Sequence, residues 1–93
     1  PLKESNTYEY FWWNACPHCL IVAKFLDKWD KKDTIKLIKY EVWYEKTNAK
    51  IMEDRFNKCD PKPEAQMSVP FMITPDGKCL MGNEPIIELF KSL

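Results

Sequence analysis

The stretch Cys16-Pro17-His18-Cys19 decides how this chain is interpreted, because two cysteines separated by two residues can either join their sulfurs or bind a soft metal. An aromatic run that is typical of a strand precedes the stretch, and a helical pattern of apolar residues follows it. A cysteine pair at such a junction places its first sulfur over the N-terminus of the helix. The sequence therefore indicates redox chemistry more strongly than metal binding.

The two residues between the cysteines support this interpretation. Pro17 suits the first position of a helix, because its missing N–H would have no partner there and its φ is already helical. Cys16 then becomes the helix cap, where backbone N–H groups and the helix dipole favour a thiolate. A protonated His18 imidazole adds a second favourable interaction with that anion. A stabilised thiolate favours the dithiol over the disulfide, so we expect a relatively oxidising couple.

Cys19 is expected to differ from Cys16 in its surroundings. Cys19, Val22, Leu26 and Trp29 follow one another at helical spacing and share one face of the predicted helix. This face is apolar, so Cys19 points toward the core. The pattern therefore predicts a division of labour, in which Cys16 attacks a substrate disulfide and Cys19 resolves the mixed disulfide.

The composition describes one domain over residues 1–93, with residues 1–7 as a loose, polar N-terminus. Hydrophobic residues make up 45% of the chain, which is enough for one core. The 14 basic and 14 acidic residues cancel, so the charge indicates neither nucleic acid nor an anionic membrane surface as a partner. The apolar runs are a few residues long, too short to span a bilayer.

The other two cysteines, Cys59 and Cys79, are single and far apart in the sequence. We expect them to be free thiols that pack in the core or at its edge, rather than a second redox pair. A structural zinc ion would need four ligands and there is no second CxxC, so no metal site is predicted. No signal peptide is visible. We expect a cytoplasmic protein, or a periplasmic or secreted one if a leader was removed before Pro1.

The remaining sequence predicts the element order β-α-β-α-β-β-α. Apolar and β-branched runs predict the strands, and helical spacing with possible caps at Thr47, Asn48 and Asn83 predicts the later helices. The expected strands are residues 8–13, 35–44, 69–73 and 78–81, and the expected helices are residues 17–30, 47–58 and 83–93. Pro75-Asp76-Gly77 predicts the turn between the last two strands.

This order, with a CxxC after the first strand, resembles the thioredoxin fold, an α/β fold with a four-stranded mixed sheet flanked by helices. The resemblance covers residues 8–93. It rests on Phe11-Trp12 ahead of the cysteines, on Ser68-Val69-Pro70 at the start of the third strand, and on the Pro75–Lys78 turn with Gly82 behind it. The last of these, with the short chain, is similar to the glutaredoxins.

The resemblance implies a thiol–disulfide oxidoreductase that exchanges the Cys16–Cys19 pair with protein or glutathione disulfides. It implies a monomer without a bound cofactor, recycled by glutathione or by a reductase. An alternative of another class is a non-catalytic binding module that holds a thiol peptide or a metal through the CxxC.

The resemblance also implies residues that bind substrate. A cis bond between Val69 and Pro70 would present the Val69 backbone to an extended substrate chain. Trp13 would lie beside the substrate groove. It stands where many glutaredoxins carry a lysine, and Gly82-Asn83 stands where they often carry paired glycines. The chain departs from the glutaredoxin pattern at both places. The resemblance as a whole still implies glutathione as a candidate co-substrate, with Gly82 and Asn83 as its contacts.

Overall fold

The computed structural model describes residues 6–93, and within them four strands form one mixed sheet in the order β2-β1-β3-β4. β1 pairs in parallel with β2 and antiparallel with β3, and β3 pairs antiparallel with β4. The strands are β1 (Thr7–Trp12), β2 (Lys36–Glu41), β3 (Phe71–Ile73) and β4 (Cys79–Met81). The mixed four-stranded sheet expected from the sequence is therefore confirmed.

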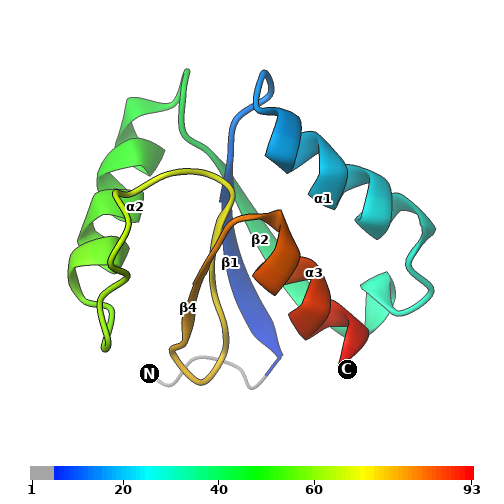
Figure 1. The fold of residues 1–93 in the computed structure, drawn as a ribbon. Helices are drawn as coiled ribbons and strands as arrows, with labels where there is room; N and C mark the ends of the chain where they lie inside the picture. Colours follow the sequence, from blue (N-terminus) through cyan, green and yellow to red (C-terminus); the bar gives the residue numbers. More distant parts are fainter. Residues whose placement is uncertain (1–5) are drawn as a thin grey trace.

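The helices cover both faces of this sheet, with α1 and α3 on one face and α2 on the other (Figure 1). They are α1 (Pro17–Lys28), α2 (Lys46–Asn57) and α3 (Asn83–Lys91), and a short 3-10 helix, η1 (Lys32–Thr34), follows α1. The expected element order is thus confirmed. Within the described residues, none of the helices combines the length and the apolar character that crossing a membrane requires.

β1 is central in the sheet, and this position explains why its residues are bulky on both sides. Tyr8 and Tyr10 pack toward α1 and α3, in a cluster with Val22 and Phe90. Phe11 points to the other face, in a cluster with buried residues of α2 and β3. Two apolar layers therefore hold the strand from which the CxxC segment emerges.

The N-terminal part of the chain differs from the prediction by a few residues. Residues 1–5 of the predicted loose segment lie outside the described residues, but Thr7 already belongs to β1 and is 6% exposed. The backbone N–H of Lys36 donates to the Asn6 carbonyl at 2.9 Å, which extends the pairing with β2. Trp13, predicted as the last strand residue, lies outside β1.

β2 ends at Glu41, earlier than the predicted boundary at Tyr44. The Glu41 carboxylate accepts the backbone N–H groups of Trp43, Tyr44 and Glu45 at 3.0, 2.8 and 3.1 Å, and these bonds stabilise a turn. Glu45 is the N-cap of α2, without a side-chain capping bond, so the predicted caps at Thr47 or Asn48 were wrong.

Cys59 and Cys79 form a disulfide, with their Cα atoms 6.1 Å apart, so the prediction of two free thiols was wrong. Cys59 follows α2 on the α2 face of the sheet. Cys79 pairs with Ile73 in the β3–β4 register, and Ile73 lies on that same face. The sheet therefore brings together two cysteines that the sequence places 20 residues apart.

Candidate active site

Cys16 is the N-cap of α1, at the junction where β1 leads into that helix (Figure 1). Its backbone is extended and Pro17 occupies the first turn, as the sequence predicted. The Cys16 Sγ accepts the backbone N–H of Cys19 at 3.2 Å, and the Cys16 N–H donates to the Trp13 carbonyl at 3.1 Å. A helix N–H directed at this sulfur favours its thiolate form.

Cys19 lies on the apolar face of α1 with Val22 and Leu26 and is 4% exposed, which confirms the predicted orientation. Burial, together with the hydrogen bond to Cys16, raises the pKa of the Cys19 thiol to about 12. At neutral pH Cys19 is therefore a protonated thiol. Cys16 and Cys19 are both free thiols in this structure.

The Val69–Pro70 peptide bond is cis, as expected, and lies beside the cysteines. The Cys16 Sγ is 3.7 Å from the Val69 carbonyl oxygen, to which its thiol donates. Pro70 is fully buried, and its carbonyl accepts the Gly82 N–H at 2.9 Å. The fold thus brings the Pro70 segment against Cys16 and ties it to the start of α3.

His18 reaches the start of α3 rather than standing alone on its helix. Its Nδ1 lies 2.9 Å from the Asn83 Oδ1, an amide oxygen that can accept a hydrogen bond from a protonated Nδ1. Asn83 was predicted to cap the last helix, but it is the first residue of α3. The N-cap is Gly82, with a φ of 99°. All three residues were expected at the site from the sequence, but the hydrogen bond between His18 and Asn83 was not predicted.

A cavity of about 430 Å³ lies at this side of the site. Its lining residues come from α1, the end of β4 and the start of α3: His18, Ile21, Met81, Gly82, Asn83, Glu84 and Pro85. The predicted contacts Gly82 and Asn83 therefore share one cavity with His18.

Trp13 precedes Cys16 in the connection from β1 to α1, and its ring stacks on Trp43 with centroids 4.6 Å apart. Together with Val69 and Met67 these rings line a second, mainly apolar cavity of about 220 Å³. Trp43 and Met67 were not predicted as site residues. The stacking of Trp13 on Trp43 depends on the turn after β2, and the sequence had predicted a strand through this turn.

No family model matches the chain, and no curated protein matches its sequence. Two solved structures are similar to it: crystal structures of the thioredoxin-like protein BC3987 and of a point mutant of that protein. Each is 21% identical, with a TM-score of 0.62, and the match covers 92% of this chain and 99% or 96% of the other. This likeness of structure, with the element order above, establishes the thioredoxin fold.

A metal centre has no support in the described part of the chain. Among residues 6–93, no group of three or more His, Cys, Asp or Glu side chains lies close enough together to hold an ion. Two of the four cysteines are bonded to each other and so do not offer thiolate ligands. The Cys16 and Cys19 sulfurs are the candidate reactive groups of the site.

Proposed function

We propose that this protein is a thiol–disulfide oxidoreductase that exchanges its Cys16–Cys19 pair with protein or glutathione disulfides. One observation carries the proposal, namely the position of the Cys16 sulfur. It caps α1, accepts the Cys19 N–H at 3.2 Å and lies 3.7 Å from the carbonyl oxygen of Val69, the residue before Pro70. This geometry supports the proposal, because a substrate chain that paired with the Val69 backbone would lie next to the Cys16 sulfur.

In the reducing direction, the Cys16 thiolate attacks one sulfur of the substrate disulfide. The substrate S–S bond breaks, and the second substrate sulfur leaves with the electron pair and takes up a proton. Cys19 then loses its proton and attacks the Cys16 sulfur, which releases the other substrate sulfur and leaves a Cys16–Cys19 disulfide. Two electrons pass from the protein to the substrate, and the reverse steps oxidise a substrate dithiol.

Two cavities offer places for the substrate: one is lined by His18, close to Cys16 in the chain, and the other by Val69, whose carbonyl contacts Cys16. An extended polypeptide fits the apolar side, where Trp13, Trp43 and Val69 would contact its side chains. Glutathione fits the more polar side, where Gly82 and Asn83 lie. Glutathione or a reductase would return the pair to the dithiol.

Reduction of insulin disulfides by dithiothreitol tests the proposed activity. We expect the protein to accelerate precipitation of the freed insulin chains, because Cys16 provides a faster route than the small thiol. The same preparation is checked for two reactive thiols before the assay. If those thiols are intact and insulin is not reduced any faster, the chain is a non-catalytic binding module, and the proposed activity is wrong.

Replacing His18 with glutamine should make the Cys16–Cys19 couple more reducing. The change removes an imidazole two residues from Cys16 that, when protonated, would stabilise a Cys16 thiolate, so the dithiol should lose stabilisation relative to the disulfide. We expect a decrease on the order of 30 mV, equivalent to about 1.4 kcal/mol for a two-electron couple. Equilibration with a glutathione redox buffer measures the potential.

Asn83→Ala is the matched variant for this prediction. It keeps the imidazole but removes the 2.9 Å hydrogen bond to Nδ1, so it reports what the position of the ring contributes. We expect a smaller decrease in potential than for His18→Gln. Equal potentials for wild-type protein and His18→Gln would contradict a role of His18 at the thiolate.

A further inference from the structure

A small cavity of about 120 Å³ lies behind Cys19, between the sheet and α1. Its lining residues come from β1, β2 and α1: Tyr10, Trp12, Cys19, Ala23, Leu26 and Lys39. Tyr10 and Lys39 are direct partners in the parallel β1–β2 register, so their side chains leave the sheet on the same face. Two polar side chains of the sheet therefore share a cavity with the buried thiol.

The Tyr10 hydroxyl is buried and has no hydrogen-bond partner in the structure. The residue as a whole is 4% exposed. A buried hydroxyl without a partner is costly, and such groups are uncommon in folded proteins. Burial, and then negative charge on Cys19 or Cys16, raises the pKa of Tyr10, so the hydroxyl stays protonated and can donate. Cys19 lines the same cavity, so a thiolate on Cys19 would offer this hydroxyl an acceptor.

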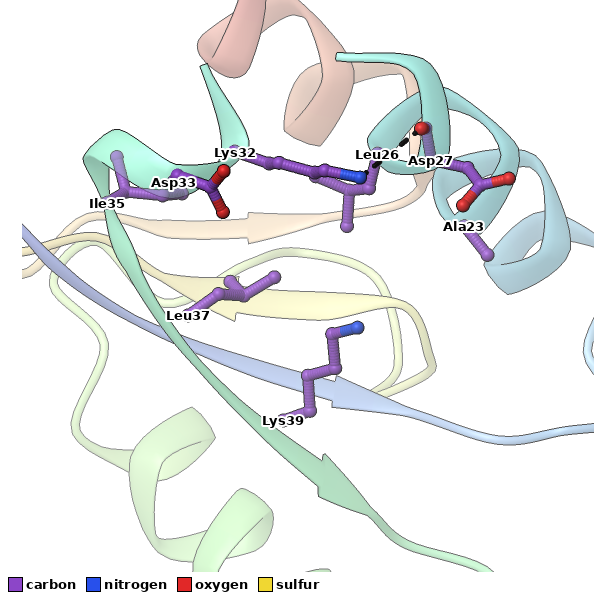
Figure 2. A pocket seen from close by; sticks show the side chains of 8 residues that line it. All are labelled: Ala23, Leu26, Asp27, Lys32, Asp33, Ile35, Leu37 and Lys39. Atoms are coloured by element: carbon purple, nitrogen blue, oxygen red, sulfur yellow. Dashed lines mark hydrogen bonds between the residues drawn. The ribbon is translucent and has the colours of Figure 1, made fainter. Parts of the chain in front are cut away.

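The inner cavity adjoins a larger one, of about 520 Å³, through Ala23, Leu26 and Lys39, which line both. Figure 2 shows this outer cavity between α1, η1 and β2, with the Lys39 side chain extending from β2 toward α1. Asp27, Lys32 and Asp33 line its outer part and are exposed. Lys39 thus stands between the buried Cys19 cavity and water.

We propose that the Tyr10 hydroxyl and the Lys39 ammonium stabilise the Cys19 thiolate as it attacks the mixed disulfide on Cys16. The Tyr10 O–H donates a hydrogen bond to the Cys19 sulfur, and the Lys39 charge opposes the negative charge that develops there. The proton of Cys19 leaves past Lys39 to water in the outer cavity. This assignment rests on the proposed function, because it concerns the second step of disulfide exchange.

The second step requires such help, because a thiolate and not a thiol is the nucleophile. Cys19 is a neutral thiol at neutral pH, since burial raises its pKa to about 12. The other titratable group beside Cys19 is Cys16, whose sulfur is tied up in the mixed disulfide at this stage. On the same face of the sheet, α3 contributes the buried side chains Ile86 and Phe90, which carry no charge.

The step balances without any further reactant. The Cys19 S–H bond gives up its proton to water, and the sulfur forms a bond to the Cys16 sulfur. The bond between Cys16 and the substrate sulfur breaks, and the substrate sulfur leaves with that electron pair and is protonated by water.

A single-turnover reaction with dithiodipyridine separates the two steps. Reduced protein is mixed with one equivalent of the reagent and quenched in acid at intervals. The peptic peptide that contains Cys16 and Cys19 is then analysed by mass, so the Cys59–Cys79 disulfide does not contribute. The peptide first carries the reagent on Cys16 and then loses it as the Cys16–Cys19 disulfide forms. The first rate reports Cys16, and the second reports Cys19.

We expect Tyr10→Phe to slow only the second rate, by about tenfold, which is the effect of one hydrogen bond to a charged group. Lys39→Met should slow the second rate by about threefold, less at high salt, because the charge is exposed. It should also move the pH dependence of that rate to higher pH. Lys39→Arg should keep the wild-type rate, as should Lys36→Met, which removes an exposed charge elsewhere on β2.

An unchanged second rate in Tyr10→Phe or in Lys39→Met would overturn the part assigned to that residue. Both variants are first compared with wild type by thermal unfolding; Tyr10→Phe keeps the buried ring, and Lys39 is exposed, so we expect both to fold. A wild-type protein whose Cys16 fails to take up the reagent would contradict the proposed function itself, which is a different outcome.

Discussion

Replacing Cys16 with serine is expected to abolish disulfide exchange, whereas replacing Cys19 with serine should accumulate mixed disulfides with the substrate. Cys16 caps α1 and its sulfur accepts a helix N–H, so we expect this sulfur to be the one that attacks. Cys19 is buried and its pKa is raised, so we expect it to react only with the sulfur of Cys16. Without Cys19 the first adduct has no route to the internal disulfide.

Intact-mass spectra after incubation with insulin, under conditions that block free thiols at the end of the reaction, measure this difference. We expect covalent adducts with Cys19→Ser and none with Cys16→Ser. The Cys59–Cys79 disulfide is present in both variants and serves as the internal control. Any adducts that form through it should be equally abundant in the two variants. Equal amounts of adduct in the two variants would show that the assignment of attacking and resolving cysteines is wrong.

The site could be predicted from the sequence wherever it depends on local chemistry. Pro17 and the apolar spacing of the following residues define the start and the inner face of α1, and these place Cys16 at the cap and Cys19 in the core. The cis bond before Pro70 followed from the resemblance to the thioredoxin fold rather than from any physical property of residues 68–70. The roles of these residues in catalysis remain predictions.

Contacts between distant segments could not be predicted in the same way. The stacking of Trp13 on Trp43 requires the turn that the Glu41 carboxylate stabilises after β2. The pairing of His18 with Asn83 requires α3 to begin opposite the first turn of α1. In both cases the sequence identified at least one partner, but the distance between the partners is set by the sheet.

Glu9, a buried carboxylate in β1, also depends on contacts with distant segments that could not be predicted from the sequence. Glu9 is 5% exposed on the face that α2 covers. The Arg55 Nε and Nη2 donate to its two oxygens at 3.0 and 3.2 Å, and the Tyr40 hydroxyl donates at 3.4 Å. Burial of a charge requires partners of this kind. Because Arg55 comes from α2, the sequence of the strand alone gives no reason for an acid at this position.

Removing the Cys59–Cys79 disulfide should cost about 2–4 kcal/mol of unfolding free energy, because the cross-link restricts the unfolded chain. It closes a segment of 20 residues that contains the loop after α2 and the whole of β3, so many conformations become accessible when it is opened. We expect a Cys59→Ala/Cys79→Ala double variant to unfold at lower urea concentration and with a larger m-value, since its unfolded state is more expanded.

Two comparisons separate the cross-link from the other effects of this substitution. Wild-type protein unfolded in the presence of reductant keeps the cysteine side chains, including the Cys59 sulfur beside the Arg55 carbonyl, and loses only the bond. A Cys16→Ser/Cys19→Ser variant removes the active-site pair and keeps the second disulfide, so reductant should lower its stability as much as that of the wild type. If reductant leaves the unfolding curve of this variant unchanged, then Cys59 and Cys79 do not form a stabilising disulfide in solution, and the active-site pair accounts for any response of the wild type.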